Sequence, residues 1–127
     1  MQTYKDMYLL SKEYGERMDC AVRAVAVATG VHYIDVQALM TSYGRTPGRR
    51  TPRAATNNTL AHLGFDKKFV PFRGKTVCTL EREFKRRKGT FLVSTRGHIL
   101  AIKDGVVQDW AKGRKHRVLS VCEVIQR

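Results

Sequence analysis

Apolar residues in the first half of the chain recur with the spacing of helices. From residue 20 to residue 30 nearly every side chain is small or apolar and Arg23 is the only charged one, which predicts a buried central helix. Asp19 is a favourable N-cap for this helix, and Gly30 is a favourable C-terminal stop. Over residues 33–43 the apolar positions follow at intervals of three and four, so the pattern predicts a second helix.

Glycine and proline interrupt the middle of the chain. Residues 44–53 contain two prolines and four arginines, which predicts an exposed loop. A short helix over residues 54–63 and a strand over residues 65–72 are expected to follow. Thr79 can cap a further helix over residues 80–88.

The two ends of the chain differ in character. Residues 1–18 mix polar and aromatic side chains and predict only a segment that leads into the domain. The last third is rich in β-forming residues and predicts strands over residues 90–94, 98–103, 106–110 and 117–125. Because helices come first and an antiparallel sheet second, the order predicts an α+β fold.

A hairpin turn predicts which residues of this sheet face each other. Asp104-Gly105 is a two-residue turn signal between the second and third β segments. Folding the chain about this turn pairs position x with 209 − x, so residue 98 faces 111 and residue 109 faces 100. We therefore expect His98 and Asp109 near the same end of adjacent strands, within about one residue step along the strand axis.

Length and charge limit the classes of function. A chain of 127 residues is one domain by its length, and 24 Lys and Arg against 11 Asp and Glu give a net charge of +13. This charge favours an anionic partner, such as nucleic acid, an acidic protein or a phosphorylated surface. No apolar run approaches the roughly 18 residues of a membrane span, and the first residues lack the pattern of a signal peptide. We expect a cytoplasmic protein that does not contact a membrane.

The cysteines point to one reactive thiol. Cys20, Cys78 and Cys122 are an odd number without a Cys-x-x-Cys pair, which disfavours a disulfide framework or a zinc knuckle. Cys20 opens the predicted central helix, where the helix dipole and unpaired N–H groups lower a thiol pKa and can hold an oxyanion. The alternative is a small buried hydrophobe. We expect Cys78 and Cys122 to be inert, and we expect neither a metal nor a cofactor.

His98 is the candidate partner of this thiol. It directly follows Gly97 at the start of a predicted strand, where a histidine is partly exposed and rigidly held, as a general base must be. An acid at Asp109 can hold the second ring nitrogen and fix its tautomer, and Trp110 is placed to shield that contact from water. The alternatives are a surface histidine beside a turn and an ordinary core tryptophan.

This order of residues resembles that of papain-like cysteine peptidases. Asp19-Cys20-Ala21 opening a helix, Gly97-His98 opening a strand and Asp109 on the next strand are most similar to the minimal forms of the family. Those forms include bacteriocin-leader-processing peptidases and small phage-encoded proteins of the same fold. The resemblance implies a central Cys-bearing helix packed on an antiparallel sheet. It also implies Cys20 as nucleophile, His98 as general base and acid, Asp109 as orienting acid, and a peptide or protein substrate.

The expected oxyanion hole departs from the family pattern. The family usually places a glutamine a few residues before the nucleophile, but residues 10–19 contain none, and Gln2 lies 18 residues upstream of Cys20. The resemblance leaves the backbone N–H groups at positions 20 and 21, with Asp19 or Tyr14 in place of the glutamine, although an ionised aspartate cannot donate a hydrogen bond. Peptidase, deamidase and transamidase activity therefore stay open.

The arginine-rich loop suggests a second kind of site. Two prolines stiffen it, and guanidinium groups suit anions through bidentate contacts, so Arg45, Arg49, Arg50 and Arg53 are candidate anion-binding residues. The alternative to an enzyme is a non-catalytic basic module that binds nucleic acid, or a host protein, on a peptidase-like fold. If a phage encodes the chain, we expect it in the host cytoplasm.

Overall fold

The computed structural model describes residues 4–108 and 115–127. Within these ranges the chain forms five helices and one five-stranded antiparallel sheet, which confirms the α+β class. The helices are α1 (Tyr4–Glu13), α2 (Cys20–Thr29), α3 (Tyr33–Ser42), α4 (Arg53–His62) and α5 (Val77–Phe84). The strands are β1 (Phe65–Phe69), β2 (Thr90–Thr95), β3 (His98–Lys103), β4 (Val106–Gln108) and β5 (Val118–Gln126).

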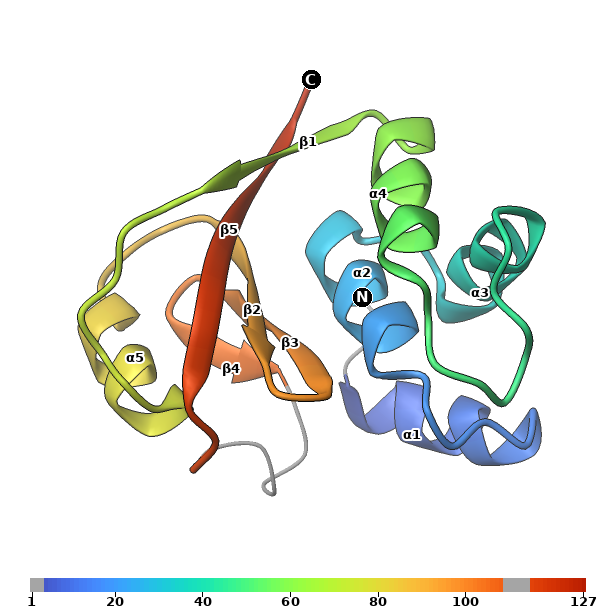
Figure 1. Cartoon of the computed structure of the whole chain (residues 1–127), viewed down its shortest axis with the longest axis horizontal. Helices are drawn as coiled ribbons and strands as arrows, with labels where there is room; N and C mark the ends of the chain where they lie inside the picture. Colours follow the sequence, from blue (N-terminus) through green and yellow to red (C-terminus); the bar gives the residue numbers. More distant parts are fainter. Residues whose placement is uncertain (1–3, 109–114) are drawn as a thin grey trace.

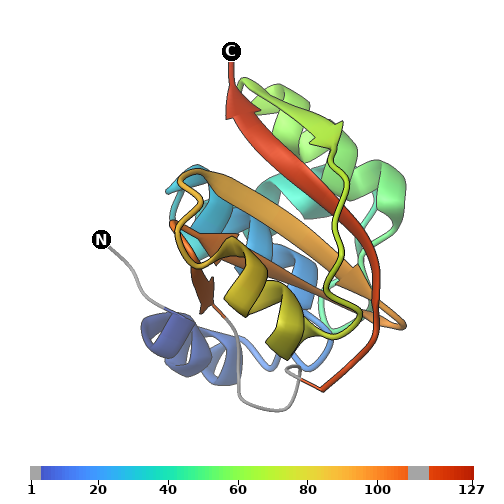
Figure 2. The same cartoon turned by 90° about the vertical axis from the view of Figure 1, so that its left-hand side faces the viewer.

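Helices cover both faces of the sheet. Its strand order is β1-β5-β2-β3-β4, with α1–α4 on one side and α5 on the other (Figure 1). Figure 2 looks onto the face that α5 crosses. Alternate residues of β3 enter two separate cores: Ala101 packs with α2, whereas Leu100 and Ile102 pack with α5. Of the helices, α2 makes the most extensive contact with the sheet, and it lies against β3.

The hairpin has the predicted register. Ala101 pairs with Gln108 and Ile102 with Val107, as folding about the Asp104-Gly105 turn requires. Both turn residues have positive φ, at 49° and 82°, as a tight two-residue hairpin demands. The predicted positions of Asp109 and Trp110 lie outside the described residues.

Two expectations for the helices are wrong. The N-terminal segment is not merely a lead-in, because α1 forms there and buries Met7 and Ser11. Thr76, rather than Thr79, is the N-cap of α5: its hydroxyl accepts the Thr79 N–H at 3.3 Å, and the Thr79 hydroxyl accepts the Thr76 N–H at 2.9 Å. This capping box starts α5 earlier than predicted, at Val77, and the helix ends at Phe84.

The strand predicted over residues 98–103 has these bounds in β3, whereas β1 stops at Phe69 instead of extending to Phe72. In the described part of the chain, every helix is too short or too polar to pass through a bilayer.

Candidate active site

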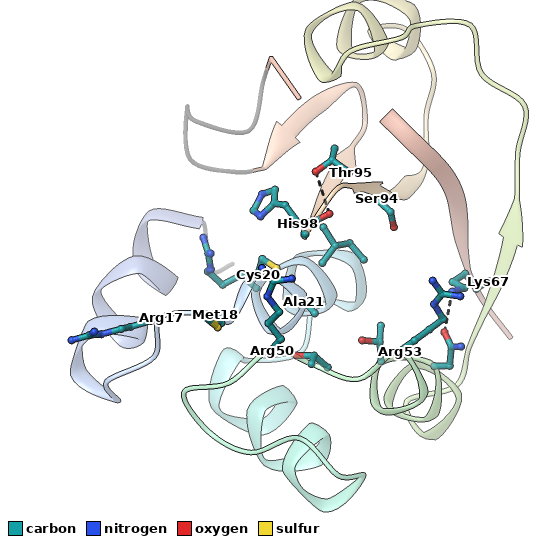
Figure 3. Close-up of a pocket in the computed structure, with 16 residues that line it drawn as sticks. Arg17, Met18, Cys20, Ala21, Arg50, Arg53, Lys67, Ser94, Thr95 and His98 are labelled. Atoms are coloured by element: carbon teal, nitrogen blue, oxygen red, sulfur yellow. Dashed lines mark hydrogen bonds between the residues drawn. The ribbon is translucent and has the colours of Figure 1, made fainter. Parts of the chain in front are cut away.

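Cys20 and His98 meet where α2 packs on the sheet. Cys20 is the first residue of α2 and is partly buried, and His98 is the first residue of β3. The His98 side chain and the backbone N–H of Ile99 are near enough to the sulfur to lower its pKa. In Figure 3 the sulfur and the imidazole lie together between α2 and β3. The predicted approach of these two residues is thus present in the structure.

The surroundings of Cys20 favour its thiolate. Burial is the largest single influence on the pKa of Cys20, and it raises the pKa. The hydrogen bonds from His98 and Ile99, together with the positive charges of His98 and Arg23, act in the opposite direction and outweigh burial. The pKa of Cys20 is therefore lowered from its ordinary value, whereas burial raises the pKa of Cys122. Cys78 and Cys122 carry free thiols away from this pair.

The tight connection between β2 and β3 holds His98 in place. Thr95 and His98 pair across the two strands, and the Thr95 hydroxyl donates to the His98 carbonyl at 3.3 Å. Gly97 has φ of 71°, a left-handed conformation that glycine adopts without strain. The ring is thus carried by a strand end with its backbone fixed on both sides.

Two backbone donors lie beside the thiol. The N–H groups of Cys20 and Ala21 belong to the first turn of α2, where a helix offers them no acceptor. Neither group has another hydrogen-bond partner among the residues that the structure describes. Both residues line the cavity, so these donors are available to an oxyanion formed at the sulfur.

Asp19 has a different role from the expected one. Its carboxylate is buried, accepts the Tyr33 hydroxyl at 2.7 Å and pairs with Arg23 Nε at 3.2 Å, and it makes no capping bond to α2. An acceptor held in this way cannot donate to an oxyanion. Tyr14 is exposed and lies outside the cavity lining, so neither side chain replaces the glutamine of the papain-like pattern.

A cavity of about 460 Å³ opens onto Cys20 and His98. Its walls come from the segment before α2, the loop before α4, α4, β1 and the turn between β2 and β3 (Figure 3). Two arginines of the predicted anion site, Arg50 and Arg53, line it. Arg49 is exposed outside the lining.

Arg45 does not belong to an open anion site. Its guanidinium binds both carboxylate oxygens of Glu16 at 2.8 Å, and both side chains are fully buried. Glu16 also accepts hydrogen bonds from Gln37 at 2.5 Å and from the Gly48 N–H at 2.6 Å. Burial is the largest influence on the Glu16 pKa and raises it, but Arg45 and the other donors prevail and lower the pKa overall. This clamp ties the arginine loop to the segment just before Cys20.

Three further basic residues line the cavity that the sequence did not indicate as site residues: Arg17, Arg23 and Lys67. Arg17 precedes Cys20 by three residues, which is a usable signal. Lys67 lies on β1 and reaches the cavity only through the tertiary fold, with its Nζ bonded to Asn57 Oδ1 at 2.9 Å.

The Cys20–His98 pair is the basis for assigning a function. The described residues contain no group of three or more His, Cys, Asp or Glu that could hold a metal ion. Asp109, the predicted third member of the triad, lies outside the described residues. Comparison of the chain with protein-family models, curated proteins and solved structures finds no match. What the chain does is therefore inferred from the chemistry of this pair and its cavity.

Proposed function

We propose that the chain is a cysteine-dependent hydrolase or acyl-transferase with a papain-like arrangement. The single observation that carries the proposal is that Cys20 and His98 line the same cavity, with His98 near enough to lower the pKa of the thiol. A helix that begins at the cysteine and packs on the strand that begins at the histidine supports the papain-like arrangement.

The chemistry begins with Cys20 as thiolate and His98 as imidazolium. The sulfur attacks a substrate carbonyl carbon and forms a C–S bond. The carbonyl oxygen becomes an oxyanion that accepts hydrogen bonds from the N–H groups of Cys20 and Ala21. His98 donates its proton to the leaving nitrogen, the C–N bond breaks and an amine or ammonia departs. This leaves a thioester on Cys20 and a neutral His98.

The second half restores the pair. His98 takes a proton from water or from an acceptor amine, which attacks the thioester carbon. The C–S bond breaks, and the products are a free thiolate, an imidazolium and a new acid or amide. Water as acceptor gives a peptidase or deamidase, and an amine gives a transamidase.

Asp109 completes the proposed triad. Folding about the Asp104-Gly105 turn predicts from the sequence that residue 109 faces residue 100. An acid at that position is suited to hold the second nitrogen of His98 and keep the first directed at the sulfur.

Alkylation of the thiols tests the proposal. Iodoacetamide labelling, mapped by mass spectrometry across a pH series, should give Cys20 an apparent pKa below the ordinary thiol value of about 8.5. H98Q should move that midpoint upward, because the hydrogen bond and positive charge are lost. H62Q is the matched control, since His62 bonds Tyr43 at the protein surface. Equal labelling rates of Cys20, Cys78 and Cys122 at about pH 6 would refute the proposal.

A further inference from the structure

The cavity around Cys20 is lined by cations. The five basic residues of its wall are Arg17, Arg23, Arg50, Arg53 and Lys67. No Asp or Glu among the described residues lines it. In a cleft with low-dielectric walls, charges of one sign focus the field and raise the local concentration of oppositely charged ligands. The site therefore favours anionic ligands, and the reaction of Cys20 with His98 does not by itself require this preference.

Arg50 stands next to the catalytic pair. Its guanidinium lies against Gly97, the residue before His98, with Nη2 at 3.4 Å from the position that a Cβ would occupy there. In Figure 3 the Arg50 side chain extends from its loop toward Cys20. A negative group bound by Arg50 would thus lie beside the reacting carbonyl.

Arg50 and Arg53 differ from Arg23 and Arg45 in their partners. Arg45 is paired with Glu16 and Arg23 with Asp19. In residues 4–108 and 115–127, no carboxylate lies within ion-pair distance of Arg50 or Arg53. Both residues are exposed at the cavity, and within the described part of the chain their fork-shaped donors have no acceptor, so their geometry matches a carboxylate.

The lining favours a peptide over a nucleic acid. Proteins that hold single-stranded nucleic acid stack its bases on aromatic side chains. No Phe, Tyr or Trp of the described chain lines this cavity. The thiol also needs a carbonyl carbon, which a peptide supplies at every residue.

We infer that the Cys20–His98 cavity accepts acidic peptide segments, with an Asp or Glu side chain near the attacked carbonyl held by Arg50 and Arg53. This inference rests on the proposed function and names its substrate class.

A pair of small electrophiles separates the two ideas. Iodoacetate is anionic and iodoacetamide is neutral. The rate of Cys20 with iodoacetate divided by its rate with iodoacetamide, normalised by the same ratio for 2-mercaptoethanol, reports the charge preference of the cavity. At low ionic strength we expect this normalised ratio to be about ten, and we expect added salt to lower it toward one. A fast iodoacetamide reaction with a ratio near one would overturn the inference and keep the proposed function. A slow iodoacetamide reaction would overturn the function itself.

Variants assign the effect to the two arginines. R50Q and R53Q should each lower the ratio severalfold, and together they should bring it near one. R49Q removes an equal charge from the same loop outside the cavity and should leave the ratio unchanged. The ratio compares two reagents on one protein, so a modest loss of folded fraction affects both rates equally. An equal fall in R49Q would assign the effect to the overall charge and overturn the inference.

Protection experiments distinguish a peptide ligand from a nucleic acid. A glutamate-rich peptide should slow iodoacetamide labelling of wild-type Cys20 more than its glutamine analogue, and R50Q/R53Q should abolish that difference. Protection by a single-stranded oligonucleotide, without protection by the acidic peptide, would overturn the choice of a peptide.

Discussion

The Glu16–Arg45 clamp gives the sharpest stability prediction. R45M removes the cation and keeps much of the side-chain volume. Glu16 would then remain buried as an anion with only the Gln37 and Gly48 donors. Breaking a buried pair by removing one partner costs about 3–5 kcal/mol. Domains are stable by roughly 5–15 kcal/mol, so this change would remove a large fraction of the total.

Urea unfolding followed by circular dichroism measures the loss. We expect the midpoint of R45M to fall by an amount that corresponds to about 3–5 kcal/mol, with the slope unchanged. R49M, an exposed neighbour in the same loop, should change stability by no more than about 0.5 kcal/mol. In the double variant E16Q/R45M neither residue of the clamp is charged, so it should lose much less than the sum of the two single variants. Equal stability of R45M and R49M would refute this reasoning.

Acid should weaken the same clamp. Burial is the largest influence on the Glu16 pKa and raises it, but the bond to Arg45 and the other donors prevail, so the folded pKa lies below the ordinary value of 4.5. A lowered folded pKa contributes stability that is present above the unfolded value and is lost as pH falls through the folded one. We therefore expect the wild type to lose stability more steeply than E16Q below about pH 4.5. Parallel stability profiles of the two proteins would contradict the assigned shift.

Three further changes test single contacts, each by urea unfolding. Y33F removes the donor at 2.7 Å from the buried Asp19 carboxylate and should cost about 1.5–3 kcal/mol. G105A places a Cβ on the carbonyl group of Lys85, the residue that follows α5, at φ of 82°, and should cost clearly more than G64A, which is comparably strained at φ of 86° in open space. T76A removes the observed N-cap of α5 and should cost about 1 kcal/mol. A G105A variant as stable as G64A, or a T76A or Y33F variant as stable as wild type, would show that the corresponding contact contributes nothing.

Local patterns predicted the positions of Cys20 and His98 at the starts of their elements. Cys20 begins an Ala- and Val-rich helix, and His98 begins a strand whose hairpin register follows from Asp104-Gly105 alone. Each of these signals lies within a few residues of the position it predicts. The packing of α2 on β3, which brings the sulfur to the ring, follows from burying the apolar side of that helix on the sheet.

Long-range contacts explain what the sequence alone could not show. Arg45 is indistinguishable in sequence from Arg49 and Arg50, and only its distant partner Glu16 makes it a buried structural residue.

The N-cap of α5 was ambiguous for a local reason. Thr76 and Thr79 are equally plausible caps by residue type, and they bond each other.

The position of the last strand has a consequence for how the protein is made. β5 lies in the interior of the sheet, and it is the only described strand that pairs with β1. A nascent chain that has left the ribosome only as far as residue 117 therefore exposes β1 without a partner and leaves one edge of β2 open to aggregation. β2, the neighbour of the strand that carries His98, gains its second partner only when β5 forms, so proteolytic removal of β5 would separate β1 from the rest of the sheet.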